Sequence, residues 1–287
     1  MMSEMKKTPY IWLISGCSSG FGREIALQAL YAGDFVGVSS RNVKDIEDIC
    51  KEYPKTALPI KLDVTNKDEI KESIQTINKV YGGLDVLVNN AGYGYLAAIE
   101  EGENEEVRKL FETNFFGALE LTKAALPGMR AQRFGRIINN SSQAGIMANP
   151  GTGYYSSSKY ALEGLMEALD KELRPLNISV TSVQPGAFRT DWSGRSMKRS
   201  NVEIDDYSEH VKQRIDMIGN IDGKQPGDPV RAAKIIFELS RNPNPPDKLL
   251  LGAGVFATYK EKLSTLLNQI DEFEQTTLSA DFPQDKS

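Results

Sequence analysis

The stretch Ile11-Trp12-Leu13-Ile14-Ser15-Gly16-Cys17-Ser18-Ser19-Gly20-Phe21-Gly22 decides the fold of this 287-residue chain. Its first four residues are apolar, which is typical of a short strand buried on both faces. Of the three glycines that follow, one allows a sharp turn, one lets the backbone approach a pyrophosphate, and one lets a helix pack closely on the strand. A helix that begins here would attract the phosphate through its free N–H groups and its dipole. We therefore expect dinucleotide binding by Gly16, Ser18, Ser19, Gly20, Phe21 and Gly22, although a purely structural turn would show the same glycines.

Short apolar runs alternate with helical patterns along most of the chain. Strands are expected at residues 10–15, 34–40, 57–63, 84–88, 135–141, 178–184 and 248–251. Helices are expected at residues 22–32, 44–51, 67–81, 104–130, 155–176, 229–241 and 255–275. This alternation predicts an α/β fold in three layers, with a doubly wound, mostly parallel sheet of seven strands and helices on both faces. We expect one domain over residues 10–275, flanked by tails at 1–9 and 276–287.

The composition excludes several classes of function. With 34 basic and 39 acidic residues the net charge is −5, which argues against a general affinity for nucleic acid or anionic membranes. The single histidine, His210, and the two cysteines, Cys17 and Cys50, disfavour a zinc site, a disulfide framework and a Ser-His-Asp triad. The apolar run at 11–14 is too short for a secretory signal or a membrane span. We expect a soluble, cytoplasmic protein without a metal, whose chemistry relies on Tyr, Ser, Lys, Asn and a cofactor.

The end of the second expected strand indicates which cofactor is preferred. An acidic residue there would accept hydrogen bonds from the adenosine ribose and repel a 2′-phosphate, but this chain has Ser39-Ser40-Arg41. Arg41 can pair with a 2′-phosphate, so we predict NADP(H) over NAD(H), unless Arg41 merely ends a strand in solvent. Asp63 ends the third strand, where it would accept from the adenine amino group or simply form a turn.

Tyr155 and Lys159 form the most informative pair of polar residues. At a spacing of four they share one face of a helix, whereas Tyr154 points about 140° away from Lys159. A phenol is a poor proton carrier near neutral pH, and a nearby ammonium would lower its pKa. Tyr155 would then act as general acid for carbonyl reduction and as general base for alcohol oxidation. By itself, however, the same spacing is common in surface pairs.

Two further polar positions lie close to expected strand ends or inside an expected helix. Ser142 follows the strand at 135–141, and alternation along an extended segment directs it away from the face of Ser141. Asn114 lies inside the helix at 104–130 beside two phenylalanines. Because asparagine is a poor helix former, it indicates a buried polar role, a local irregularity or a simple kink.

Taken together, these residues resemble the short-chain dehydrogenase/reductase family over residues 10–190, with Ser15 where the family usually has threonine. The resemblance implies a Rossmann fold in which Tyr155 is the acid/base and Lys159 also binds the nicotinamide ribose. It implies that Ser142 positions the substrate oxygen, that Asn114 holds a relay water, and that Ser19 and Arg41 meet a 2′-phosphate. Further implied cofactor contacts are Asp63, Val64, Asn90, Ala91, Gly92, Pro185, Gly186 and Thr190, the last at the carboxamide.

Within the family the chain is most similar to the branch of 17β-hydroxysteroid and retinol dehydrogenases, which leaves the carbonyl or alcohol substrate open. Residues 190–228 are polar, lack a clear strand, and are interpreted as a substrate lid or a solvated excursion. Phe188, Trp192 and Met197 suggest an apolar substrate pocket, with Met217 as further apolar surface in the lid. The resemblance also implies a homodimer or homotetramer paired through the helices at 104–130 and 155–176. A non-catalytic NADP(H) sensor and a sugar-nucleotide epimerase or dehydratase are the alternative functions.

Overall fold

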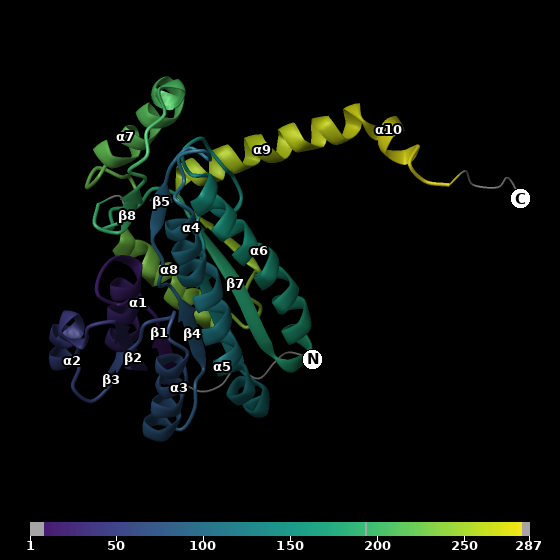
Figure 1. Ribbon diagram of the computed structural model, residues 1–287. Coiled ribbons are helices and arrows are strands. Elements are labelled where there is room, and N and C mark those ends of the chain that lie inside the picture. The colour runs from purple at the N-terminus through teal and green to yellow at the C-terminus, as the bar shows by residue number, and fades with distance from the viewer. Residues whose placement is uncertain (1–8, 193, 283–287) are drawn as a thin grey trace, which may run out of the picture.

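A parallel sheet of seven strands forms the centre of the structure, a computed structural model that describes residues 9–192 and 194–282 (Figure 1). Its strands are β1 (Ile11–Ile14), β2 (Phe35–Ser40), β3 (Ala57–Lys61), β4 (Val86–Asn89), β6 (Gly135–Asn140), β7 (Ile178–Pro185) and β9 (Lys248–Leu251). They lie in the order β3-β2-β1-β4-β6-β7-β9, and every neighbouring pair is parallel. The order reverses between β1 and β4, which is where α/β sheets of this kind bind ligands.

Helices cover both faces of the sheet, as the alternation predicted. One layer contains α1 (Gly20–Tyr31), α2 (Glu47–Glu52) and α8 (Pro229–Arg241), and the other contains α3 (Lys67–Tyr81), α5 (Ala118–Gln132) and α6 (Gly153–Leu173). In β1 the side chains of Trp12 and Ile14 join the first layer, and those of Ile11 and Leu13 join the second. The strand is thus buried on both faces, which explains its unbroken apolar sequence. The predicted three-layer fold is confirmed.

The continuous helix expected at residues 104–130 is interrupted. The structure has α4 (Asn104–Phe111), a π-helical turn at Glu112–Gly117, and then α5. Asn114 lies inside the π-helical turn and is buried. π-Helical turns are often found at functional sites because they redirect a side chain within a helix. The prediction of one uniform helix is wrong. Asn114, which suggested a local irregularity, lies in the π-helical turn, and its side chain bonds to the Tyr93 backbone there.

The expectation that residues 190–228 lack a strand is also wrong. β8 (Met197–Arg199) pairs in parallel with β5 (Gly94–Leu96) in a small second sheet. With only three residues, two of them Lys198 and Arg199, β8 is too short and too polar to show an apolar strand pattern. The segment continues through a 3₁₀ turn (Asp205–Tyr207), a π-helical turn (Ser208–Lys212) and α7 (Gln213–Asn220).

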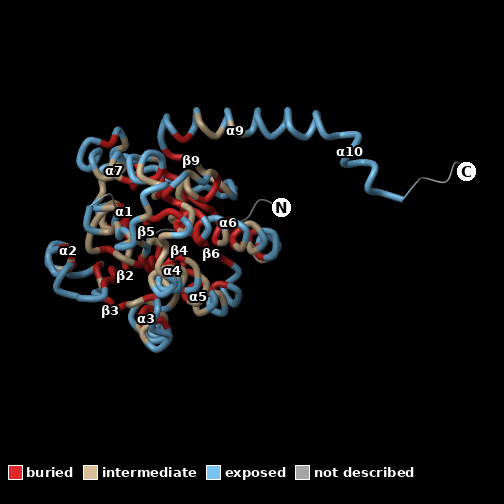
Figure 2. The backbone as a smooth tube through the Cα atoms, turned by 45° about the horizontal axis from the view of Figure 1, so that its top comes forward, coloured by how far each residue is buried: buried red, intermediate tan, exposed pale blue. Residues whose placement is uncertain are grey.

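The C-terminal part of the described chain projects away from the sheet (Figures 1 and 2). It consists of α9 (Ala253–Glu272) and the short α10 (Glu274–Leu278), so the helical region extends beyond the predicted start of the tail at residue 276. Residues 1–8 of the predicted N-terminal tail lie outside the described residues, as do 283–287 at the C-terminus. Among the helices of the described residues, none combines the length and apolarity needed to cross a membrane.

Candidate active site

The turn between β1 and α1 is joined to the end of β4 by Ser15 and Asn90. The Asn90 amide nitrogen donates to the carbonyl oxygens of Ser15 and Gly16, at 2.9 and 3.0 Å. The Ser15 hydroxyl accepts from the backbone N–H groups of Asn90 and Ala91, at 2.9 and 3.0 Å. The Ser15 hydroxyl thus has a structural role, because it joins the glycine turn to the residues that follow β4.

Backbone angles and close contacts explain why glycine occupies positions 16, 20 and 22 of this turn. Gly16 and Gly20 adopt φ angles of 74° and 57°, in the left-handed region that other residues rarely enter. A Cβ atom at Gly22 would lie 2.3 Å from the Gly16 carbonyl oxygen and 2.4 Å from the Asn90 amide nitrogen. The Ser19 side chain makes no capping bond to α1, and the first turn of α1 carries no acidic residue. The backbone here can therefore approach a phosphate closely.

The end of β2 lies beside this turn. The Cys17 N–H donates to the Ser39 carbonyl at 2.7 Å, and the Ser39 hydroxyl donates to the Ile14 carbonyl at 2.7 Å. Arg41 follows directly and is exposed, and no carboxylate stands at the strand end. Cys17 itself is buried, and burial raises the pKa of its thiol to about 12, so it is not a reactive thiolate.

Asp63 and Val64 follow β3 and contribute mainly to local structure. One carboxylate oxygen of Asp63 accepts from the N–H and the hydroxyl of Thr65, at 2.9 and 2.7 Å. Asp63 therefore forms the turn that the sequence allowed as an alternative. Its contact with the adenine amino group stays a prediction. The buried Val64 side chain lies against Gly117, where a Cβ atom would be 2.7 Å from its methyl group.

Tyr155 and Lys159 lie on one face of α6 and are both buried, at 6% and 5% exposure. The Lys159 ammonium donates to the carbonyl oxygen of Asn140, at the end of β6, at 2.8 Å, and lies 5.9 Å from the centre of the Tyr155 ring. The Asn140 amide in turn donates to the Asn90 side chain at 2.9 Å. A continuous set of contacts therefore leads from the glycine turn to Tyr155 along the carboxyl edge of the sheet.

Burial decides the protonation of this pair. It raises the pKa of the Tyr155 phenol to about 12, and the adjacent side chains of Ser142 and Trp192 offset part of the increase. Burial also lowers the pKa of the Lys159 ammonium to about 8, while the carboxylate of Glu163 opposes that change. The expectation that the ammonium lowers the phenol pKa below its usual value is therefore wrong here. Loss of water around the phenol outweighs an ammonium that bonds to Asn140 instead.

The neighbouring serines and tyrosines separate as the geometry suggested. Ser142 lies beside Tyr155 and accepts a hydrogen bond from the Ala144 N–H at 3.0 Å. Ser141 points toward Gly145, where a Cβ atom would lie 2.8 Å from its hydroxyl. Tyr154 leaves the site and donates to the Ile99 carbonyl at 2.5 Å. Ser142 and Tyr155 are therefore the members of these pairs that share the site.

Asn114 is held by its side chain. Its amide oxygen accepts from the Tyr93 N–H at 3.0 Å, and its amide nitrogen donates to the Tyr93 carbonyl at 2.9 Å and to the Ser158 hydroxyl at 3.2 Å. Gly92 lies between Asn114 and Lys159, because a Cβ atom there would be 3.1 Å from the amide oxygen and 3.8 Å from the ammonium. The π-helical turn thus brings Asn114 to the Lys159 side of the site.

The segment after β7 closes over the glycine turn. Pro185 ends β7, and the Gly186 N–H extends its pairing with β9 by donating to Leu251 at 3.0 Å. Thr190 lies above Gly20, where a Cβ atom would be 3.3 Å from the Thr190 Cβ. Phe188 packs on Phe21, with ring centres 5.1 Å apart, and belongs with the core cluster around α1 and α8.

Of the three predicted substrate residues, Trp192 is the one that the structure brings to Tyr155. Their ring centres lie 5.2 Å apart, and Gly94 leaves room for the indole, since a Cβ atom there would be 2.9 Å from it. Met197 instead packs with Leu96, Ala98, Val211 and Ile215 in a small cluster of its own. Met217 is 59% exposed. Phe188 and Met197 thus support neighbouring structure, the alternative that their sequence left open.

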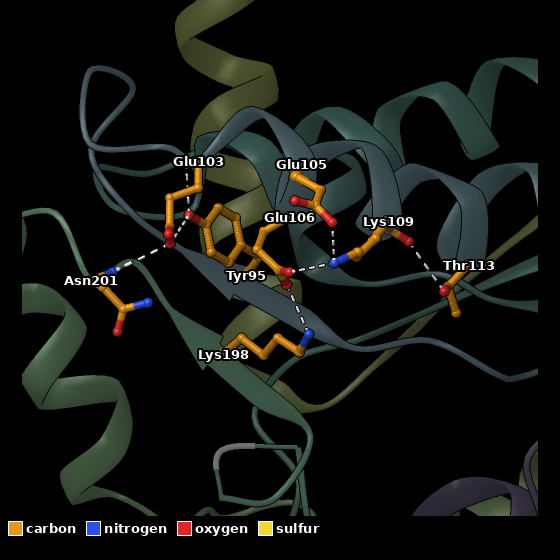
Figure 3. A network of polar contacts seen from close by, with 8 residues as sticks. All are labelled: Tyr95, Glu103, Glu105, Glu106, Lys109, Thr113, Lys198 and Asn201. Atoms are coloured by element: carbon orange, nitrogen blue, oxygen red, sulfur yellow. Dashed lines mark hydrogen bonds and ion pairs between the residues drawn. The ribbon is translucent and has the colours of Figure 1, made fainter.

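Residues 190–192 and 194–228 are tied to the region before and within α4 by polar contacts, part of which Figure 3 shows. Lys198 on β8 forms an ion pair with Glu106 at 2.8 Å, and its ammonium lies 5.3 Å from the centre of the Tyr93 ring. The Ser200 hydroxyl donates to the Glu101 carbonyl at 2.5 Å, and the Asn201 N–H to Glu103 at 3.4 Å. The exposed His210 takes no part in the site.

Sequence reasoning missed Glu163, Asn140 and Ser158. Glu163 is buried at 7% exposure one turn beyond Lys159, and burial raises the pKa of its carboxyl. Its spacing of four from Lys159 and eight from Tyr155 was the available signal. Asn140 acts on Lys159 through a backbone carbonyl, so its side-chain identity carries no signal.

Within residues 9–192 and 194–282 no group of three His, Cys, Asp or Glu residues is arranged to hold a metal ion.

Comparison with known proteins decides the family. A model of the family described as short chain dehydrogenase matches residues 11–201, which is more than half of the chain. The chain belongs to the short-chain dehydrogenase/reductase family. Its oxidoreductases act on CH–OH groups with NAD(P), and this chain is one of these enzymes.

Named relatives within the short-chain dehydrogenase/reductase family are similar over most of their length. A 3-ketodihydrosphingosine reductase of Bacteroides thetaiotaomicron is 35% identical over 266 residues, 92% of this chain and 96% of that protein. An NADPH-dependent 3-dehydrocapnine reductase of Ornithobacterium rhinotracheale is 35% identical over 208 residues, 70% of this chain and 74% of that protein. The crystal structure of a short-chain dehydrogenase from Streptomyces avermitilis has a TM-score of 0.90 at 37% identity, covering 96% of this chain and all of that one.

Proposed function

We propose that this enzyme transfers a hydride between NADP(H) and a carbonyl or secondary alcohol, with Tyr155 as the general acid/base. The observation that carries the proposal is the buried Tyr155–Lys159 pair, connected through Asn140 and Asn90 to the glycine turn. A cofactor bound at that turn and a substrate at Tyr155 would thus meet at one edge of the sheet. Such convergence of a phosphate-binding turn and a proton donor is what the reaction needs.

The residues of the turn fit a dinucleotide. Gly22 lets α1 pack closely on the turn, since a Cβ atom there would lie 2.3 Å from the Gly16 carbonyl oxygen. The N-terminus of α1 opens directly from this turn and can attract a phosphate. Gly16, Ser18, Ser19 and Gly20 would hold the pyrophosphate, Thr190 the carboxamide, and Lys159 the ribose next to it. When bound, the nicotinamide supplies or accepts the hydride. Everything else in the reaction depends on how the chain orients the two reactants and moves a proton.

Tyr155 would donate its proton to the carbonyl oxygen as the alcohol forms. Because burial keeps its pKa at about 12, the phenol stays protonated near neutral pH and is ready to donate. Lys159, with its pKa at about 8, still carries its charge at pH 7 and favours the phenolate that results. Ser142 would hold the same oxygen by a hydrogen bond while charge develops on it. In oxidation the same groups act in reverse.

The Asn114 side chain has both its oxygen and its nitrogen engaged, with Tyr93 and Ser158. A relay water at this residue would therefore contact the main chain of the π-helical turn. The hydrogen bonds of the Asn114 side chain keep this turn in place beside Lys159.

The preference for NADP(H) rests on Arg41 and on the absence of a carboxylate in Ser39-Ser40-Arg41. Arg41 is exposed next to the glycine turn, where its guanidinium can pair with a 2′-phosphate. The dependence on NADPH in the name of the Ornithobacterium relative supports the same preference.

We further propose a ketone substrate with an apolar part, reduced in the cytoplasm. The Trp192 ring beside Tyr155 offers apolar surface to the substrate, and both named relatives are reductases. A panel of aliphatic, aromatic and long-chain 3-keto compounds, followed by the absorbance of NADPH, tests the proposal. We expect NADPH-dependent reduction of at least one apolar ketone. NADPH binding without turnover of any compound would indicate a sensor. Conversion of nucleotide sugars alone, followed by product analysis because the cofactor is regenerated, would indicate an epimerase or dehydratase.

A further inference from the structure

The projecting helix α9 carries a stripe of large apolar side chains that nothing in the described chain covers (Figures 1 and 2). Only its first turns contact the body: Val255 is buried, and the Lys262 ammonium hydrogen-bonds the Tyr160 hydroxyl at 2.8 Å. From residue 263 to 282 every residue is exposed. Phe256, Leu263, Leu266, Leu267, Ile270 and Phe273 are between 41% and 64% exposed. An apolar surface of this extent on a helix indicates an interaction surface.

The spacing of the stripe identifies the kind of surface. Phe256, Tyr259, Leu263, Leu266, Ile270 and Phe273 follow one another in alternating steps of three and four residues. This repeat of 3.5 residues is that of a coiled-coil seam, in which each apolar side chain fits between side chains of a facing helix. The partner that such a seam fits is another helix with the same repeat.

We propose that α9 pairs antiparallel with α9 of a second copy of this chain, with the two-fold axis at Asn268. A two-fold pairing brings identical seams together, so one chain supplies both halves of the interface. Leu263 then faces Phe273 of the second copy, and Leu266 faces Ile270 of the second copy. Leu267 lies next to Leu267 of the second copy, which explains an apolar residue beside the seam.

The charges beside the seam select this orientation and register. Lys260 and Glu274 each follow a seam residue directly, as Leu267 does, so all three lie on the same flank of the seam. About the axis at Asn268, Lys260 lies within two residues of the level of Glu274 of the second copy, about 3 Å along the helix. Glu274 follows α9 after a break of one residue, at Phe273. A parallel pairing in register would instead place Lys262 opposite Leu267 and Gln269 opposite Glu274, without opposite charges.

The same charges argue against a membrane as the occupant. Residues 253–278 contain two lysines, Lys260 and Lys262, against four carboxylates, Glu261, Asp271, Glu272 and Glu274. Helices that lie on anionic bilayers are usually rich in basic residues on their polar face. The excess of carboxylates would weaken binding to an anionic bilayer. In the pairing with a second copy, Lys260 and Glu274 instead attract one another.

Cysteine cross-linking tests the pairing and its direction. Under mild oxidation Leu267→Cys should form a disulfide-linked dimer, because the two positions meet next to the axis. Ser264→Cys, one turn away on the outer face, is the matched control and should stay monomeric on a denaturing gel, as should wild type. Ile270→Cys distinguishes the directions, since a parallel seam would bring the two positions together. Cross-linking at 270 rather than 267, or at neither position, overturns the proposal.

The mass in solution gives an independent test. Ile270→Asp should halve the sedimentation mass without changing the thermal unfolding or NADPH affinity, because Ile270 is 64% exposed. Lys260→Glu and Glu274→Lys should each weaken association about tenfold, and the double variant should restore it. An unchanged mass for Ile270→Asp, a wild type that is monomeric at tens of micromolar, or binding to phosphatidylserine vesicles without self-association contradicts the proposal.

Discussion

At the scale of single residues, the burial of Lys159 couples the stability of the fold to its chemistry. Its folded-state pKa is about 8, below the ordinary value of 10.5. Between these two pH values the unfolded chain binds a proton that the folded chain has released, so stability rises with pH in this window. At pH 7 the folded state holds a buried charge, and this lowers the free energy of unfolding.

We therefore expect Lys159→Met to raise the free energy of unfolding at pH 7 by ~2 kcal/mol while it abolishes turnover. The advantage of the variant should shrink as the pH rises from 8 toward 10.5. Denaturant titrations between pH 7 and 10.5 measure the gain in the free energy of unfolding and its dependence on pH. Lys71→Met, at an exposed position, is the control. A variant that is less stable than wild type at pH 7 would show that the charge at Lys159 stabilises the fold.

Arg41 is the second residue whose role is open to a direct test. Arg41→Asp should weaken NADPH binding at least about tenfold, because a charge-assisted bond to the 2′-phosphate is lost and repulsion replaces it. NADH binding should stay the same or improve. Lys71→Asp, which makes the same charge change on the outer side of α3, should alter neither. An unchanged ratio of NADPH to NADH affinity in Arg41→Asp refutes the assignment.

The spacing of four was sufficient to predict that Tyr155 and Lys159 share one face of α6, because a helix fixes the angle between its side chains. The choice of Ser142, which precedes α6, rested on the resemblance to the family. Residue types and spacing were not sufficient to predict the pKa directions. Those depend on how much water the surrounding elements exclude, and the ammonium is bonded to the Asn140 carbonyl, which any residue type would offer.

At the scale of elements, the β5–β8 pairing and the polar contacts to Glu101, Glu103 and Glu106 hold residues 197–201 against the body of the protein. Exposed ion pairs such as Lys198–Glu106 contribute little to global stability, generally less than about 1 kcal/mol. Their effect is local, because they fix the position of the strand that follows Trp192.

Lys198→Glu should therefore raise the KM for the ketone substrate several-fold, with little change in the KM for NADPH or in the melting temperature. The reason is repulsion from Glu106, which displaces β8 and with it Trp192, whose ring packs on Tyr155. Lys212→Glu, which only breaks an exposed pair with Glu203 inside the segment, is the control. An equal rise in both KM values would assign Lys198 to general folding instead.

The main elements of the sheet were predictable because several strands, such as β1 and β4, are near-continuous apolar runs that alternate with helical patterns. The exceptions follow from length and context. β8 has three residues and gains its partner from residues 94–96, about a hundred positions earlier. The π-helical turn depends on bonds between Asn114 and the Tyr93 backbone, which local sequence does not encode.

At the scale of the whole molecule, the fold brings the carboxyl ends of β1, β4 and β6 to one edge of the sheet. The glycine turn, Asn90 and the Lys159–Asn140 contact all lie along it. The three-layer arrangement follows from strand alternation and the right-handed crossover rule. The projection of α9 does not, since an amphipathic pattern does not reveal whether its apolar side packs on its own chain or on another.

The central claim is that Tyr155 transfers the proton, and one comparison tests it most directly. For a ketone found in the panel, Tyr155→Phe should lower kcat by about a thousandfold or more, with the NADPH dissociation constant within about twofold of wild type. Tyr154→Phe, which lacks only a hydroxyl bonded to Ile99, should retain nearly full turnover. A Tyr155→Phe enzyme that keeps more than about a tenth of wild-type kcat would contradict the account.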